Sequence, residues 1–219
     1  MKKQTGFTLI ELAIVLVIIG LLLGGVLKGQ ELINQAKIKN VIADFNGITA
    51  AYYGYQDRYK AIPGDDAGAA RFSTTTSGNG DGQLAGAYNA NVASPAATDE
   101  SSLFWQHLRL AGFVGGSGGS NPNNAVAGIV GVQQGGDTFR STAGTAGTGF
   151  TGLILCSSNL PDKIAVAIDT TLDDGNPQTG SVRAITQTGS NPTIAANAAA
   201  DTTPYSETGG KQYLICKSM

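Results

Sequence analysis

Glu11 is the only ionisable residue in a long apolar segment of this sequence. It lies within residues 7–27, a segment that is apolar apart from Thr8 and Glu11 itself. A carboxylate inside an apolar membrane helix is costly, so it usually has a partner and a function. No lysine or arginine occurs between Lys3 and Lys28. We therefore expect a cationic partner from another chain or from a newly formed amino terminus. The alternative is an acid that reaches the membrane interface from near the helix end.

A second group of oxygen-bearing side chains lies in the sequence Ser77-Gly-Asn-Gly-Asp-Gly82. Asn79 and Asp81 stand at alternate positions with a glycine next, as in the first half of a calcium-binding loop. An EF-hand needs a glutamate at the twelfth position, where this chain has Tyr88, so that motif is excluded. Two interpretations stay open: a calcium site of another type, with a carboxylate added from residues 65–66, or a plain turn.

Little else in the sequence is suited to catalysis. The chain has one histidine, His107, and two cysteines, too few for a structural zinc site or a histidine-rich metal centre. It has no Gly-x-Ser-x-Gly nucleophile motif and no Walker phosphate loop. Fourteen basic and sixteen acidic residues give a net charge of -2, which does not favour nucleic acid as a partner. We therefore expect no enzymatic activity and, calcium apart, no cofactor.

The apolar segment 7–27 is long enough to cross a membrane. Its 21 residues would form a helix of about 31 Å, close to the thickness of the bilayer core. Lys2 and Lys3 favour a cytoplasmic amino end. A cleaved signal peptide is the alternative interpretation. However, proline-free sequence with mainly helical spacing of apolar residues continues to Tyr55, which predicts one long helix over residues 7–58.

The amino-terminal sequence Met-Lys-Lys-Gln-Thr-Gly6, followed by Phe7-Thr-Leu-Ile-Glu11, resembles the class III leader and mature start of type IV prepilins and type II secretion pseudopilins. The resemblance implies that a prepilin peptidase cuts between Gly6 and Phe7 and methylates the new amino group of Phe7. It also implies that Glu11 pairs with the terminal amine of a neighbouring subunit. Opposite charges so placed would neutralise each other in a low-dielectric environment.

One feature departs from the family pattern. The family commonly has a proline near the end of the apolar segment, where this chain has Lys28. The glycines at positions 20, 24, 25 and 29 are the residues that weaken the helix here, each by about 1 kcal/mol relative to alanine. They either soften the helix or allow close packing between membrane helices.

From about residue 59 the composition changes to glycine, serine, threonine, asparagine and alanine, and Pro63-Gly64 marks a turn. The patterns predict helices over residues 99–111 and from Pro161 to Leu172, with Trp105 and His107 packed or at a rim. Strands are predicted over 126–132, 149–156, 182–186 and 212–217. We therefore expect an α+β fold in which a long N-terminal helix packs on a small antiparallel-sheet head, in agreement with the pilin architecture.

Cys156 and Cys216 lie in the part of the chain that this topology places outside the cytoplasm, where a disulfide can persist. Chain-entropy models assign about 4 kcal/mol to such a bond. The resemblance implies a disulfide-bounded C-terminal region, residues 156–216, as in many pilins. Two free buried thiols are the alternative.

The resemblance also implies a domain plan and a set of partners. Residues 1–6 would be the leader, 7–58 the long helix with its transmembrane part at 7–27, and 59–219 the extracytoplasmic head. The partners would be other copies of the chain and related pilins, the prepilin peptidase, the inner-membrane assembly platform and the lipid bilayer.

The function that follows is that of a structural subunit of a type IV pilus-like filament. A pseudopilin of a type II secretion system is one alternative, and a minor pilin or adhesin with a ligand-binding head is another. Before assembly the chain would lie in the inner membrane with its head in the periplasm. After assembly it would belong to a cell-surface pilus or a periplasmic pseudopilus.

Overall fold

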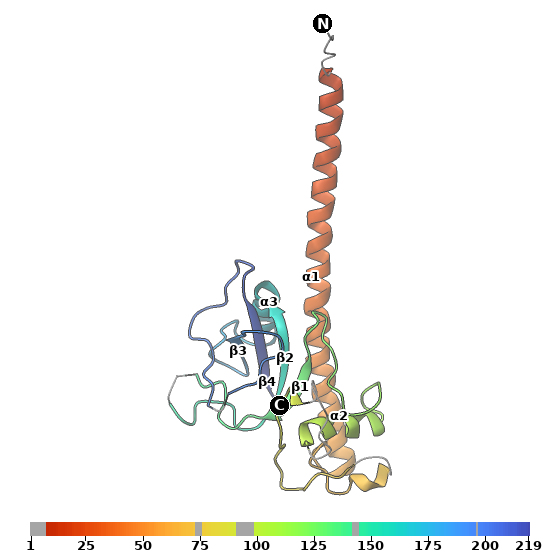
Figure 1. Cartoon of the computed structure of the whole chain (residues 1–219), viewed down its shortest axis with the longest axis vertical. Helices are drawn as coiled ribbons and strands as arrows, with labels where there is room; N and C mark the ends of the chain where they lie inside the picture. The colour runs from red at the N-terminus through yellow and green to blue at the C-terminus, as the bar shows by residue number, and fades with distance from the viewer. Residues whose placement is uncertain (1–7, 73–75, 91–98, 142–144, 196) are drawn as a thin grey trace. The chain divides into compact units, whose positions relative to one another are not determined.

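The computed structural model describes residues 8–72, 76–90, 99–141, 145–195 and 197–219. The chain divides into two compact units, one ending at Lys37 and the other beginning at Ile38. The elements, in chain order, are α1 (Leu9–Tyr59), a short 3-10 helix η1 (Ala69–Phe72), α2 (Glu100–Leu110), β1 (Val130–Gln134), β2 (Leu153–Pro161), α3 (Asp162–Leu172), β3 (Val182–Thr186) and β4 (Gln212–Ser218) (Figure 1).

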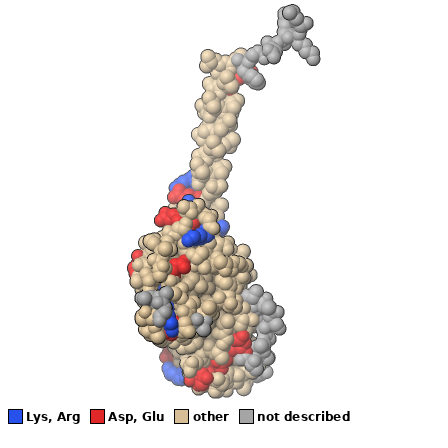
Figure 2. Space-filling model, turned by 60° about the vertical axis from the view of Figure 1, so that its left-hand side comes forward, with Lys and Arg blue, Asp and Glu red and all other residues tan. Residues whose placement is uncertain are grey.

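Helix α1 is continuous over 51 residues because no proline interrupts it before position 63. In the first unit its aliphatic side chains are exposed, and a tan stretch almost free of charge marks this segment in Figure 2. The helix is long and apolar enough to cross a membrane. A Cβ atom added at any of Gly20, Gly24, Gly25 and Gly29 would meet nothing within 4 Å. Within the described ranges, no contact therefore requires glycine at these positions.

In the second unit, α1 presents one apolar face to the core. Val41, Phe45, Ile48, Tyr52 and Tyr55 are all buried, and their spacing of three or four residues places them on one side of the helix. They belong to a core cluster that also includes residues of α2, α3 and all four strands. The buried face of α1 therefore begins at Val41, 14 residues after the apolar segment has ended at Leu27.

The sheet is antiparallel, with the strand order β1-β2-β4-β3. Alternate residues face opposite sides, so Leu155 and Ile215 join the cluster that contains α1, whereas Ile154 and Leu214 join a second cluster. That second cluster is completed by Tyr88, Phe139, Phe150 and other residues of the connecting segments. A long N-terminal helix followed by a small antiparallel sheet confirms the predicted α+β, pilin-like architecture.

Two strands begin and end several residues away from the sequence prediction, whereas the other predicted elements differ from it by at most two residues. The strand expected at 126–132 is β1 at 130–134, because Asn124 Oδ1 accepts hydrogen bonds from the amides of Val126 and Gly128 and holds a turn there. The strand expected at 149–156 starts at Leu153 and continues to Pro161, because Leu160 and Pro161 still pair with β4. Pro161 therefore caps α3 rather than forming its first turn.

Candidate functional site

The start of α1 is held by a reciprocal pair of residues. Oε2 of Glu11 accepts hydrogen bonds from the backbone N–H of Thr8 at 2.8 Å and from the Thr8 hydroxyl at 2.7 Å. In return, the amide of Glu11 donates to Oγ1 of Thr8 at 3.4 Å. Thr8 immediately precedes the helix and Glu11 is its third residue, so this is a capping box. The box satisfies two of the backbone donors that a helix start leaves without intrahelical partners.

This pairing adds a contact that the sequence analysis did not predict. Thr8 supplies two neutral donors to Glu11 from within its own chain, and the cationic partner expected from another chain or from a new amino terminus stays a prediction. The pattern Thr-x-x-Glu before an apolar run is the sequence signal that would have predicted the contact. Among the described residues, Oε1 of Glu11 has no hydrogen-bond partner, so one carboxylate oxygen is available to a donor from another chain.

The expected processing residues Gly6 and Phe7 lie outside the described residues. Thr8 follows them directly, so the expected new amine would lie one residue before the capping box. After Glu11 the next ionisable residues are Lys28 and Glu31, which form an exposed ion pair at 2.8 Å. The apolar surface between these charges is uninterrupted and contains no second acid.

Comparison with known protein families gives a match on this segment. Residues 1–27 match the family model described as the prokaryotic N-terminal methylation motif. This segment is similar to the class III leader and mature start of type IV pilins and pseudopilins. The match supports membership of the pilin and pseudopilin family, and it points to a structural subunit rather than an enzyme. Neither the curated proteins nor the solved structures that were compared match the chain.

The pilin-type motif has consequences for partners and location. It implies cleavage by a prepilin peptidase and polymerisation with other pilins. Together with the apolar helix, it fits a membrane-anchored precursor. The match ends at residue 27, so the remaining candidate residues are judged from the structure of the head alone.

Cys156 and Cys216 form a disulfide with an S–S distance of 2.06 Å. The two residues stand directly opposite each other on the neighbouring strands β2 and β4. Both are fully buried, on the sheet face that belongs to the second cluster. The bond therefore joins the two central strands beneath the connecting segments, and it closes the C-terminal region between residues 156 and 216.

The calcium candidates Asn79 and Asp81 lie beside two buried acids. Carboxylate oxygens of Asp65, Asp81 and Glu100 lie within 4.8 Å of one another. However, the Asp65 carboxylate already accepts the backbone N–H groups of residues 80, 81 and 82 at 2.6–3.1 Å. Glu100 likewise accepts two backbone N–H groups, from residues 79 and 85. These amides satisfy the buried carboxylates without an ion, and calcium binding stays a prediction.

The side chains of Asn79 and Asp81 also contact each other. The Asn79 amide donates from Nδ2 to Oδ2 of Asp81 at 3.0 Å, and its Oδ1 accepts the Asp81 backbone N–H at 2.9 Å. Asp66, which the sequence offered as an additional ligand, instead pairs with Arg71 and accepts the hydroxyl of Tyr55. The structure thus brings Asp65, but not Asp66, to the candidate calcium ligands, and adds Glu100.

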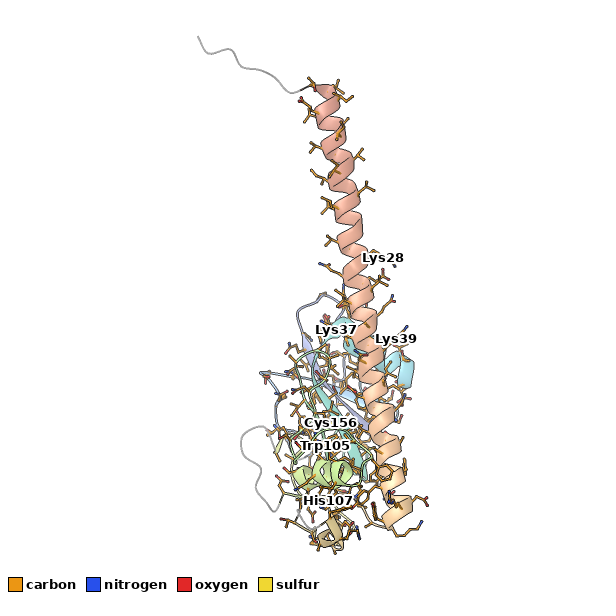
Figure 3. The ribbon with its side chains drawn as sticks, turned by 90° about the vertical axis from the view of Figure 1, so that its right-hand side faces the viewer. Lys28, Lys37, Lys39, Trp105, His107 and Cys156 are labelled. Carbon is orange, nitrogen blue, oxygen red and sulfur yellow. A yellow bond between two sulfur atoms is a disulfide. The ribbon has the colours of Figure 1, made fainter. Side chains whose placement is uncertain are left out.

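Trp105 and His107, both on α2, are fully buried (Figure 3). The sequence predicted that these two side chains are either packed in the core or placed at its rim. The first prediction is confirmed and the second is wrong. Nδ1 of His107 accepts the backbone N–H of Gly64 at 2.9 Å, and Nε2 lies 3.0 Å from the carbonyl oxygen of Thr76. Burial lowers the pKa of His107 below its ordinary value. These contacts assign the imidazole a structural role in the head.

Proposed function

We propose that the chain is a structural subunit of a type IV pilus-like filament. Its precursor is inserted in the inner membrane with the head in the periplasm, cut between Gly6 and Phe7, and methylated at the new terminus. The subunit then polymerises through its N-terminal helix. The observation that carries this proposal is the methylation motif at residues 1–27, which ends at Leu27, the last residue of the uninterrupted apolar run.

The exposed apolar surface of α1 is the surface through which subunits would associate. Side chains from Leu9 to Leu27 are exposed along this part of α1. In the precursor, lipid covers them; in a filament, the helices of neighbouring subunits take the place of lipid. Because lipid is as apolar as leucine, close packing and polar contacts decide the association in a membrane. Glu11 is the one acid in that surface and the natural place for such a contact.

Charge pairing fits this role for Glu11. In the proposed assembly, the ammonium of Phe7 in one subunit reaches Glu11 in a neighbour. Oε2 of Glu11 is already held by Thr8, which orients the carboxylate and leaves Oε1 for the incoming ammonium. Two opposite charges brought together inside an apolar filament satisfy each other, whereas either charge alone there is costly.

Two other functions share the same motif. A pseudopilin of a type II secretion system would assemble in the same way but stay periplasmic and support secretion. A minor pilin or adhesin would use its head to bind a surface or ligand. The motif is common to pilins and pseudopilins, so the three functions are separated by what the bacterium loses without the chain.

The experiment is a deletion of the gene in its native bacterium, complemented with wild type, Glu11→Gln or Glu31→Gln. Glu31→Gln is the matched control because it removes an exposed acid from the same helix. Sheared extracellular filaments composed mainly of this chain, lost with Glu11→Gln only, support the proposal. Loss of protein secretion without loss of filaments indicates the pseudopilin, and loss of adhesion alone indicates the adhesin. Normal filament numbers with Glu11→Gln contradict the assembly mechanism.

A further inference from the structure

The connection that follows α1 is fastened to α2 through one imidazole. Gly64 donates its backbone N–H to Nδ1 of His107, while Nε2 of the same ring faces the carbonyl oxygen of Thr76. An N–H can only donate and a carbonyl can only accept. The proton of the neutral ring must therefore be on Nε2, and Nδ1 must be unprotonated.

The contact at Gly64 is tight. Its φ of +94° lies in the left-handed region that favours glycine, and an added Cβ would lie 2.4 Å from the carbonyl oxygen of Glu100 and 2.6 Å from a methyl group of Leu84. The backbone at residue 64 is thus pressed against the first turn of α2. No water could enter between Gly64 and the ring without moving the segment away.

Segments farther along the connection depend on this attachment. The carboxylate of the neighbouring residue, Asp65, accepts the backbone N–H groups of residues 80, 81 and 82. The next residue, Asp66, accepts the Tyr55 hydroxyl at 2.6 Å and so connects the segment to α1. Movement of residues 63–66 away from His107 therefore breaks hydrogen bonds to two other parts of the head.

We propose that a proton at Nδ1 of His107 detaches residues 63–66 from α2, so that this connection opens in mild acid. Protonation places an N–H at Nδ1 directly opposite the N–H of Gly64, and two donors cannot share the contact. The bond from Nε2 to Thr76 survives, because both states of the ring carry that proton. The imidazolium gains exposure to solvent only when the Gly64 segment moves.

The groups that face the ring define how it titrates. Tyr55 of α1 stacks on it with centroids 6.4 Å apart, and Phe72 of η1 lies at 6.5 Å. The largest influence is burial, which lowers the pKa of His107; Arg71 acts in the same direction. The hydrogen bond to Thr76 and the charges of Asp66 and Glu100 oppose that shift. The net direction is downward, so the closed connection holds the ring neutral.

The sign of the pH dependence follows from that direction. The closed state binds the proton more weakly than an exposed histidine, whose pKa is about 6.5. The free energy that favours the closed state is therefore at its maximum above about pH 6.5, and it decreases as the pH falls below that value. Between that value and the pKa of the closed state, the population of the open state rises up to about tenfold for each pH unit.

The test uses the full-length protein in detergent micelles. His107 is the only histidine, so its ring nitrogens are assigned in a nitrogen-15 spectrum without further labelling. Amide exchange is followed at Gly64 and, as reference, at Ile215 in the centre of the sheet. We expect the Nε2–H tautomer at neutral pH and a loss of Gly64 protection relative to Ile215, up to about tenfold per pH unit, as the ring titrates.

His107→Gln is the control variant, because glutamine offers one acceptor and one donor and does not titrate in this range. In this variant we expect the protection of the Gly64 amide from exchange to stay constant over the pH range in which histidine titrates. The same loss in His107→Gln would assign the opening to Asp66 or Glu100 and overturn the proposal. Titration of the wild-type ring with unchanged Gly64 protection would overturn it too. If circular dichroism shows that His107→Gln does not fold, two measurements on the wild type still test the proposal. They are the tautomer of His107 and the pH dependence of Gly64 protection relative to Ile215.

Discussion

Thr8 and Glu11 are connected three times at the start of α1, and two of these hydrogen bonds end on the same carboxylate oxygen, Oε2 of Glu11. The other oxygen, Oε1, has no hydrogen-bond partner among the described residues. A residue that would be costly in an apolar segment is therefore half satisfied within its own chain. Its second carboxylate oxygen can accept a hydrogen bond from a partner outside the chain.

The first prediction concerns Thr8. Thr8→Val keeps the branched shape but removes the hydroxyl that both donates to Glu11 and accepts the Glu11 amide. Loss of an N-cap costs about 0.5–2 kcal/mol of helix stability. We expect membrane insertion to persist and filament yield to fall, because the carboxylate is less firmly oriented. The yield is measured by quantifying sheared filaments, and Thr8→Ser should restore it. Equal yields for the valine and serine variants would contradict the proposed role of the Thr8 hydroxyl in orienting Glu11.

The second prediction concerns processing. Gly6→Val places a branched side chain at the residue before the expected cut, and we expect the precursor to stay uncleaved. Mass spectrometry of the membrane fraction should find the first six residues still attached and Phe7 unmethylated. Gly20→Val is a suitable control, since a Cβ there meets no described residue within 4 Å. Mature, methylated protein from Gly6→Val would exclude the proposed cleavage site.

The third prediction concerns the disulfide between the central strands. Replacing both cysteines by serine should lower the stability of the head by about 2–5 kcal/mol. Both sulfurs are fully buried among apolar side chains, so serine hydroxyls there add to the loss. Thermal melting of wild type and variant without reductant measures the difference. Labelling of the unfolded, unreduced wild type by a thiol reagent should give no signal; two labelled thiols would contradict the bond.

The fourth prediction uses Asp169 on α3, which is fully buried and accepts the hydroxyl of Tyr205 at 2.6 Å. Burial raises the pKa of Asp169 to about 6, and the nearby charges of Asp174 and Asp173 act in the same direction. The folded state thus binds this proton more tightly than the unfolded chain. The stability that Asp169 contributes is present below about pH 4 and is lost as the pH rises through about 6.

Asp169→Asn removes that dependence, because its amide is neutral throughout and its oxygen can still accept the Tyr205 hydroxyl. At pH 7 we expect the variant to be more stable than wild type by roughly 1–3 kcal/mol, with the difference vanishing near pH 4. Urea unfolding at both pH values measures it. Asp57→Asn, at an exposed acid of α1, serves as control. A variant that is less stable at pH 7 would show that the hydrogen bond to a charged carboxylate outweighs the cost of burial.

The fifth prediction tests the calcium candidates. If Asn79 and Asp81 bind calcium together with Asp65 and Glu100, millimolar calcium should raise the Tm and a chelator should reverse the rise. Asp81→Asn, at an exposed position, should abolish the response without unfolding the head. Magnesium at the same concentration controls for ionic strength. Melting that does not depend on calcium or chelator would identify the segment as a turn held by backbone amides.

Local signals explain the parts that the sequence predicts well. The apolar run, the absence of proline and the Thr-x-x-Glu pattern all lie within a few turns of helix, so α1 can be predicted from residues that are close together in the sequence. The strands are less exact. Val126 and its neighbours are apolar enough for a strand, but the side chain of Asn124 accepts hydrogen bonds from the backbone N–H groups of Val126 and Gly128 and holds them in a turn. Competition of this kind is decided by a single side chain and not by an average pattern.

The sequence by itself determined the membrane-capable helix, the position of its lone acid and the methylation motif, because each depends on residues close together in the chain. Only the tertiary structure decided that Cys156 faces Cys216, that Asp65 collects the amides of residues 80–82, and that His107 holds Gly64. These contacts join residues between 15 and 60 positions apart. Their partners are selected by strand register and by the requirement to satisfy buried polar groups, which arise only when distant segments pack together.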